Sequence, residues 1–335
     1  MAQIETRTAC DPAQLAEWGR TAGTPFVIRG AAAHWPLAAA ARESASAALA
    51  YMLQFDQGQA AEVMIGPPQI AGRFFYTDDV LGLNFRREQV PLRAIAKRLL
   101  ALQDEAQPPA IYAGALATAA HLPGFDNANP FELALAQPRA QSRVWLGNRG
   151  QVATHFDMSD NVAVVALGRR RFTLFPPEAT GDLYVGPLNF TLAGQPVSMV
   201  DPLAPDFSRF PRFTAAQAKM QQAELGPGDA IFIPAMWWHH VEALEPVNLL
   251  VNYWYNDLDL GGGFLALVHA MLAVRDLAPP ARSAWQQWFD HFVFGAGAQH
   301  AADHLPLAAR GINGPPSPVR NETIRRFMIQ VLGGT

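Results

Sequence analysis

Cysteine is almost absent from this chain, since Cys10 is the only one in 335 residues. A single cysteine excludes an internal disulfide framework and is typical of a reducing compartment. The first residues, MAQIETRTACDPAQ, lack the basic and then apolar layout of a signal peptide. The most apolar window, FLALVHAMLAV at 264–274, is far shorter than a membrane span. We therefore expect a cytoplasmic protein that has no membrane partner.

Charged residues are also scarce, because they make up 16% of the chain, and the formal net charge is -4. This weakly acidic balance does not suggest general affinity for nucleic acid, although a local basic patch stays possible. Half of the residues are apolar, which is typical of a folded protein and not of a disordered one. The length suffices for one large domain or for a core domain with an appended helical module.

The sequence texture divides the chain into three regions. Residues 1–135 mix helical patterns with short strands, such as a strand in TPFVIRG (24–30) and a helix in LRAIAKRLLALQ (92–103). Residues 136–260 contain short β-like runs bounded by Gly, Pro or Asn, which predict a sandwich or barrel. Residues 261–335 return to helical patterns, so we expect a separate helical module there.

Two stretches predict specific local structures. NVAVVALGRRRFTLFPP predicts a β-hairpin that turns near Gly168 and Arg169. AWQQWFDHFVF carries a helical stripe of apolar side chains. The stripe consists of Trp285, Trp288, Phe289, Phe292 and Val293.

THFDMSDN (154–161) contains the first candidate metal ligands. His155 and Asp157 lie two residues apart, so on a strand both side chains project from the same face. A His-x-Asp pair with one distant histidine is the facial triad of non-haem Fe(II) oxygenases, which leaves coordination positions open for a cosubstrate and oxygen. GDAIFIPAMWWHHVEA (228–243), in a second β-like run, supplies the distant histidine.

His239 and His240 compete for the role of third ligand, because neighbours on a strand point to opposite faces. His239 shares a face with the apolar Val241, whereas His240 shares one with Glu242. The apolar face should line the barrel interior, so His239 is the favoured ligand, unless a bulge near Pro234 reverses the choice. The spacing alone is equally compatible with histidines that serve only as core residues of a β-sandwich.

Several motifs together resemble the cupin-like JmjC (jumonji C) dioxygenases. They are HFD, NVAVVALGRRRFTLFPPE, ELGPGDAIFIPAMWWHHVEAL and VNYWYND, and the likeness runs from about residue 24 to 257. The closest likeness is to the group containing the asparaginyl hydroxylase that inhibits hypoxia-inducible factor. The resemblance implies a mainly β fold with helical decoration, a double-stranded β-helix or jelly roll. It also implies a hydroxylase that uses Fe(II), 2-oxoglutarate and O2 and releases succinate and CO2.

The resemblance assigns roles to individual residues. His155, Asp157 and His239 would hold the iron, since His239 ends the family's Pro-x-x-Trp-x-His frame. Tyr112 in IYAG matches a tyrosine that holds the distal carboxylate of 2-oxoglutarate. Arg170 stands where the family has lysine; it keeps the charge and can bind a carboxylate bidentately. The alternative for Arg170 is a solvated charge on the hairpin.

Other family positions are matched less closely. Thr154 is an approximate counterpart of a cosubstrate-binding threonine, because QVATH appears one residue shorter. Asn161, Asn252 and Trp254 match positions that line the site around metal and cosubstrate; their alternative role is core packing. Gly114 replaces a glutamine of the asparaginyl hydroxylase, so peptide recognition is expected to differ.

Two rival functions stay open. One is a metal-binding cupin sensor or interaction protein without 2-oxoglutarate turnover, which the replacement at Arg170 supports. The other is a different cupin chemistry, such as isomerisation or thiol oxidation, but such barrels usually offer more histidines per site.

The resemblance favours a protein side chain as the substrate. A tRNA base is disfavoured by the acidic balance, and a small molecule stays possible. Loops 66–90 and 178–212 are the candidates for specificity. The C-terminal stripe predicts a homodimer by resemblance, or else a helix packed on its own domain.

Overall fold

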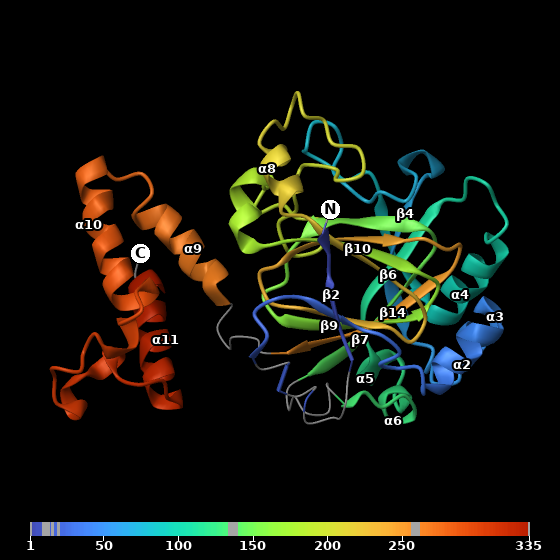
Figure 1. Cartoon of the computed structure of the whole chain (residues 1–335), viewed down its shortest axis with the longest axis horizontal. Helices are drawn as coiled ribbons and strands as arrows, with labels where there is room; N and C mark the ends of the chain where they lie inside the picture. Colours follow the sequence, from blue (N-terminus) through green and yellow to red (C-terminus); the bar gives the residue numbers. More distant parts are fainter. Residues whose placement is uncertain are drawn as a thin grey trace. The chain divides into compact units, whose positions relative to one another are not determined.

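Two β-sheets make up most of the larger of the two units of the chain, Met1–Leu258 and Asp259–Thr335 (Figure 1). The computed structural model describes residues 2–8, 14, 17–18, 21–132, 140–255 and 262–333. Cys10 lies outside the described residues. Strands from the predicted parts 1–135 and 136–260 share the larger sheet, and that three-part division of the chain stays a prediction.

The smaller sheet has five strands in the order β1-β11-β10-β13-β8. They are Ala2–Gln3 (β1), Gln221–Leu225 (β11), Arg170–Phe175 (β10), Trp238–Ala243 (β13) and Gly150–His155 (β8). The larger sheet has nine strands in the order β2-β3-β12-β9-β14-β7-β6-β4-β5. They are Glu5–Arg7 (β2), Phe26–Ile28 (β3), Ala230–Ile233 (β12), Asp160–Leu167 (β9), Asn248–Tyr255 (β14), Gln141–Gly147 (β7), Ala110–Ala117 (β6), Ala60–Gly66 (β4) and Arg86–Pro91 (β5).

The chain passes repeatedly from one sheet to the other. β7 and β8 lie in different sheets, and so do β9 and β10, β11 and β12, and β13 and β14. Consecutive strands in opposite sheets are the pattern of a jelly roll. The mainly β fold predicted from the sequence, a double-stranded β-helix with helical decoration, is confirmed.

The predicted hairpin between β9 and β10 is wrong. β9 pairs with β12 and β14, whereas β10 pairs with β11 and β13. The chain does turn at Gly168, with a φ of +76°, but the turn joins the two sheets. Both strands are almost wholly buried, so each needs its own pair of neighbours, which a local apolar pattern does not reveal.

Apolar side chains from both sheets meet in the barrel interior. Phe172 and Leu174 of β10 and Val241 of β13 pack there against Ala163 and Val165 of β9. These residues alternate along their strands with others that point outward, as the period of two requires. A polar group placed on an inner face is therefore enclosed by apolar side chains.

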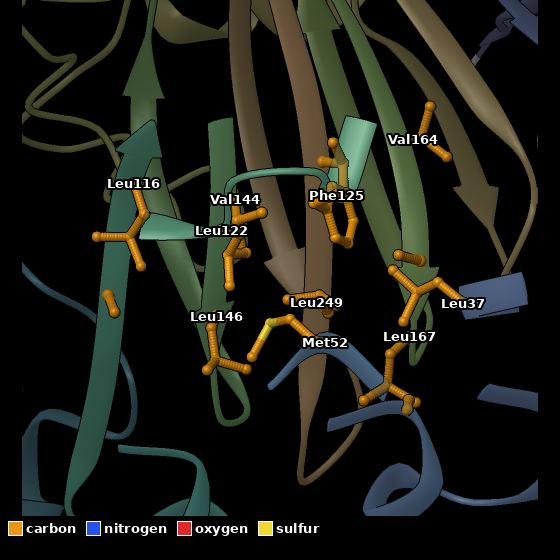
Figure 2. Close-up of a cluster of buried hydrophobic side chains, with 14 of the residues drawn as sticks. Leu37, Met52, Leu116, Leu122, Phe125, Val144, Leu146, Val164, Leu167 and Leu249 are labelled. Atoms are coloured by element: carbon orange, nitrogen blue, oxygen red, sulfur yellow. The ribbon is translucent and has the colours of Figure 1, made fainter. Parts of the chain in front are cut away.

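Helices cover the outer face of the nine-stranded sheet. They are Pro36–Glu43 (α2), Ala45–Met52 (α3), Leu92–Ala101 (α4), Thr118–His121 (α5) and Phe125–Ala128 (α6). Met52 of α3 packs in one cluster with Val144 and Leu146 of β7 (Figure 2). Because these two β7 residues point outward to the helices, the residues that alternate with them, Arg143 and Trp145, point into the barrel. On the smaller sheet, α8 (Phe213–Ala218) contributes to a separate outer cluster.

The C-terminal unit is helical and buries little of its apolar surface. Its helices are Gly262–Ala273 (α9), Pro279–Phe289 (α10) and Pro318–Gly333 (α11), and a π-helical turn, Asp290–Phe294, continues α10. Among its described hydrophobic residues, only Ala302 is buried. The exposed residues of the predicted stripe are Trp285, Trp288, Phe292 and Val293. The described part of the chain contains no helix with the length and hydropathy of a membrane span, and the cytoplasmic location stays a prediction.

We expect Gly168→Ala to lower the free energy of unfolding by about 2–4 kcal/mol. A Cβ here would lie 2.4 Å from Asn248 Oδ1 and 3.0 Å from the carbonyl oxygen of Val247, at a positive φ. Urea denaturation measures the change. Gly181→Ala is the matched control, because no heavy atom lies within 4 Å of its Cβ position. Equal urea midpoints for the two variants would contradict this account of the turn.

Candidate metal centre

Three potential metal ligands converge at the end of β8. His155 ends this strand, Asp157 follows it, and His239 lies opposite His155 on β13. The two imidazole rings are 4.2 Å apart between centroids, and His239 Nε2 lies 3.6 Å from Asp157 Oδ2. Ligand atoms of the three residues all lie within 4.8 Å of one another. Two imidazoles and one carboxylate can hold a metal ion, and within the described residues this is the only such group of three.

A β-bulge in β8 determines which of its side chains face inward. His239 pairs with His155, but Val241 pairs with Val152, so the same stretch contains one more residue in β8 than in β13. The extra residue lets Val152 and His155 point to one face, which simple alternation would forbid for residues three apart. The inward face of β13 carries both His239 and Val241, and Val241 belongs to the core between the sheets.

Each histidine ring is held by a backbone carbonyl. His155 Nδ1 lies 2.8 Å from the carbonyl oxygen of Ala153, and His239 Nδ1 lies 3.0 Å from that of Trp237. A ring nitrogen that faces a carbonyl carries the proton, so the lone pair on Nε2 is left for a metal. Burial, with a smaller effect of His155, lowers the pKa of His239 to about 4. The ring is therefore neutral at neutral pH, which is the form that binds a metal.

Hydrogen bonds hold the Asp157 carboxylate in place. Trp254 Nε1 donates to Asp157 Oδ2 at 3.1 Å, and Asn161 Nδ2 makes a longer contact of 3.4 Å with the same oxygen. Asn161 Oδ1 accepts from Asn252 Nδ2 at 3.0 Å, and Asn252 Oδ1 accepts from Trp145 Nε1 at 2.6 Å. The structure thus brings the predicted residues Asn161, Asn252 and Trp254 to the candidate centre, next to its carboxylate ligand.

Trp145 is a site residue that the motifs did not identify. Its ring stacks on Tyr112 with centroids 6.0 Å apart and meets Trp254 edge-on at 5.7 Å. A Cβ at Gly114 would lie 2.9 Å from the Trp145 ring, so the glycine leaves room for the indole. The signal that could have found Trp145 was the alternation of its strand, which places it on the inward face.

Arg170 is a buried cation with unused donors. It is 2% exposed, and its Nε and Nη2 atoms have no hydrogen-bond partner among the described residues. With Tyr112, Asp157 and His239 it lines a cavity of about 50 Å³. Burial lowers the pKa of Arg170 and raises the pKa of Tyr112, and contact between the two opposes both shifts. A buried charge is costly unless it is paired, so this cavity suits an anion.

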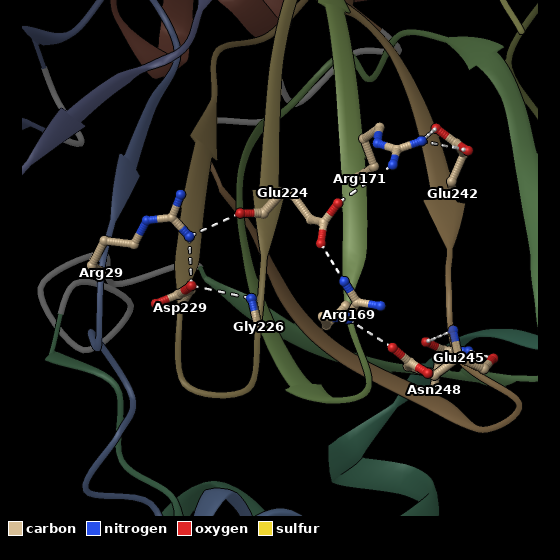
Figure 3. Close-up of polar contacts among 9 residues, drawn as sticks. All are labelled: Arg29, Arg169, Arg171, Glu224, Gly226, Asp229, Glu242, Glu245 and Asn248. Atoms are coloured by element: carbon tan, nitrogen blue, oxygen red, sulfur yellow. Dashed lines mark hydrogen bonds and ion pairs between the residues drawn. The ribbon is translucent and has the colours of Figure 1, made fainter.

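The arginines on either side of Arg170 behave differently (Figure 3). Arg169 pairs with Glu224 at 2.6 Å, and Arg171 pairs with Glu242 at 3.3 Å. Both flanking side chains are partly exposed, with 54% and 36% of their surface accessible. Alternation along β10 sends them outward and Arg170 inward. The alternative that Arg170 is a solvated charge is therefore wrong.

A larger cavity of about 520 Å³ adjoins the candidate ligands. Its wall includes His155 and Asp157, and it shares Tyr112 with the smaller cavity. Phe74 and Arg87 come from the first predicted specificity segment, 66–90. Residues 191–195 come from the second, 178–212. Both loops expected to govern specificity therefore border the same space.

Thr154 and His240 lie next to the ligands but on the opposite face of the sheet. The Thr154 hydroxyl and both ring nitrogens of His240 are buried and have no hydrogen-bond partner among the described residues. Neither residue lines the two cavities. A role of Thr154 in cosubstrate binding stays a prediction, and this position does not favour it.

The sequence of residues 12–260 matches the family described as the cupin-like domain. The chain belongs to this family. The match includes every strand from β3 to β14 and all three candidate ligands. The cupin-like JmjC family predicted from the motifs is confirmed. A closer likeness to the asparaginyl hydroxylase stays a prediction.

Curated relatives match part of this cupin-like chain. HSPB1-associated protein 1 of Rattus norvegicus is 36% identical over 116 residues, which are 34% of this chain and 24% of the relative. tRNA wybutosine-synthesizing protein 5 of Gallus gallus is 38% identical over 108 residues, 32% of this chain and 31% of the relative. Lysine-specific demethylase 8 of Xenopus tropicalis is 34% identical over 113 residues, 33% and 24% of the two chains. The cupin-like chain thus spans about a quarter to a third of these relatives.

Burial of His240 makes the stability of this cupin-like protein sensitive to acid. Burial lowers the pKa of His240 to about 4; nearby Asp201 opposes the shift, while His155, Arg73 and His239 add to it. A histidine in the unfolded chain has a pKa of about 6.5. Between these values the unfolded state binds a proton that the folded state does not, so stability falls as the pH drops through this window.

We expect His240→Leu to reduce the loss of stability between about pH 7 and pH 4.5 by about 2–3 kcal/mol, because the buried titrating group is gone. Urea denaturation at the two pH values measures the loss of stability. The variant should still lose some stability in acid, because the pKa of His239 is also lowered. His34→Leu is the control, since His34 is exposed. An unchanged pH dependence in His240→Leu would show that His240 is not the acid-sensitive group.

Proposed function

We propose that this protein is an Fe(II)- and 2-oxoglutarate-dependent oxygenase that hydroxylates a protein side chain. One observation carries the proposal: the three candidate ligands lie beside a cavity that also contains the unpaired, buried guanidinium of Arg170. A metal site alone would not require a free cation in the same cavity. A site for a metal and a dicarboxylate together would require both.

The ligand set fits Fe(II). His155, Asp157 and His239 offer two neutral imidazoles and one carboxylate, the donor set of the facial triad. Three protein ligands leave further coordination positions for a cosubstrate and O2. Hydrogen bonds to each ligand keep it oriented, as metal sites generally require.

The smaller cavity fits the distal carboxylate of 2-oxoglutarate. The unused Nε and Nη2 atoms of Arg170 lie on one edge of the guanidinium, and two parallel donors on one edge bind a carboxylate bidentately. Tyr112 lines the same cavity, in contact with Arg170, and offers its hydroxyl. Arginine therefore replaces the family lysine with its charge intact and with an additional donor.

Fe(II) held by His155, Asp157 and His239 would supply the activation of O2, with 2-oxoglutarate as the reductant that becomes succinate and CO2, and so the hydroxylation of a C–H bond. The protein positions the participants. Arg170 and Tyr112 orient the cosubstrate, and Trp254 and Asn161 hold the Asp157 carboxylate. The larger cavity admits the target group beside the ligands, so the reacting atoms meet in one orientation.

The second candidate is a metal-binding cupin that senses or interacts without turning over 2-oxoglutarate. Its specific support is the departure from the family lysine at Arg170. Uncoupled turnover of 2-oxoglutarate separates the two candidates, because only an oxygenase converts the cosubstrate to succinate.

We expect anaerobic Fe(II) and 2-oxoglutarate to produce a weak visible charge-transfer band with the parent protein. His239→Ala should abolish the band, because the metal loses one ligand. Arg170→Met should weaken 2-oxoglutarate binding about 10–100-fold through the loss of charge-assisted hydrogen bonds. Arg170→Lys should recover part of the affinity, because it restores the charge.

Uncoupled succinate release in air is the second readout of that experiment. Arg169→Met is the matched control, because Arg169 is a partly exposed neighbour in the same run and forms its ion pairs outside the cavities. If the parent protein binds the metal but shows neither the charge-transfer band nor succinate release, the sensor function becomes the better candidate.

We infer that the substrate is a protein side chain, with a tRNA base or a small molecule as the other candidates. One relative carries tRNA in its name, which keeps that alternative in the test. The larger cavity accommodates a side chain or a small ligand equally well by volume. Its polar groups discriminate better, as argued below.

We expect the protein to form a homodimer through its C-terminal helices. Large apolar side chains are exposed along α10 and the turn that follows it, more than a free surface usually carries. They are Trp285, Trp288 and Phe292. Trp288→Glu with Phe292→Glu should shift the protein from dimer to monomer in sedimentation velocity. Gln286→Glu adds charge to the same helix as the control. A parent protein that sediments as a monomer at micromolar concentration would exclude this interface.

A further inference from the structure

A second arginine points into the barrel and has no anionic partner among the residues that the structure describes. Arg143 lies on β7, two residues before Trp145 and on the same face. It lines the 520 Å³ cavity together with His155 and Asp157. It belongs to the larger cavity and not to the smaller one that contains Arg170.

The Arg143 side chain is held in place but not neutralised. Nη1 donates to the carbonyl oxygen of Ala115 at 3.3 Å, and Nη2 donates to Gln141 Oε1 at 3.0 Å. The guanidinium carbon lies 5.1 Å from the centroid of the Trp254 ring. Nε is buried and has no hydrogen-bond partner among the described residues. Every contact is with a neutral group, so the positive charge and one donor stay available.

The other arginine of the cavity wall is already paired. Arg87 forms an ion pair with Glu62 and donates to the carbonyl oxygen of Leu192. Apart from the candidate ligands, the described part of this wall therefore carries one uncompensated positive charge, that of Arg143. A single cation suits a single carboxylate, whereas a nucleic acid backbone is generally met by several cations.

We propose that Arg143 selects acidic peptides, by binding an Asp or Glu carboxylate next to the residue that enters the cavity. The inference rests on the proposed oxygenase function and specifies the substrate class of that site. Trp254 links the two groups structurally, because it stacks under Arg143 and donates to Asp157. Recognition and the candidate metal ligands are thus held by one side chain.

Fluorescence polarisation with two pools of labelled, end-blocked short peptides tests the proposal. One pool carries Asp or Glu at a single position, the matched pool carries Asn or Gln there, and all other positions are mixed uncharged residues. The parent protein should bind the acidic pool about tenfold more tightly. Arg143→Met should remove the preference, Arg143→Lys should retain part of it, and Arg143→Glu should transfer it to a pool with Lys or Arg.

Arg149→Met is the matched control, because Arg149 is an exposed arginine between β7 and β8 and does not line the cavity. Equal binding of the two pools by the parent, or no binding of either, would overturn the proposal. So would a preference that persists in Arg143→Met. Arg143-dependent binding of a short single-stranded RNA, tighter than that of the acidic pool, would assign the site to nucleic acid instead.

The charge-transfer band of the same preparations, recorded without peptide, separates this inference from the proposed function. A band without an acidic preference refutes only the role of Arg143. The absence of the band refutes the oxygenase, whatever the peptides do. Thermal unfolding shows whether each variant is folded. If Arg143→Met does not fold, Arg143→Lys is the milder substitution.

Discussion

The pairing of β8 with β13 is the constraint on which the rest of the candidate centre depends. It sets His155 opposite His239 and, through the bulge, turns both rings to the inner face of the sheet. Asp157 follows directly and reaches the same space. A shift of one residue in this register would send a histidine to the outer face, so the candidate metal site is only as well defined as this ladder.

Positive charge inside the barrel is the second organising feature. Arg170 is buried and Arg143 is partly buried, and each keeps at least one buried donor without a partner among the described residues. A fully buried cation such as Arg170 costs several kcal/mol when it is unpaired, which the large apolar clusters around the two sheets offset. An unpaired cation in the interior lowers the stability of the fold unless an anion binds to it, so these arginines are better explained by ligand binding than by folding.

The aromatic residues of the barrel mouth connect these two features. Trp145 contacts Tyr112 and Trp254 and donates a hydrogen bond to Asn252. Trp254 in turn donates to a candidate metal ligand. Large rings with one polar atom can fill the space between the cavities and still fix polar neighbours. The absence of a side chain at Gly114 makes that packing possible.

Residue type, strand alternation and order along the chain could be read from the sequence. They were enough for a sandwich or barrel and for the preference of His239 over its neighbour, because alternation is a local property of a strand. The resemblance of the motifs to a known family narrowed the fold to a jelly roll. Only the tertiary structure decided which strands pair, since β9 and β10 separate into two sheets. It also decided the bulge in β8, the role of Trp145 and the unpaired state of Arg143. These depend on contacts between residues far apart in the chain, and no local pattern records them.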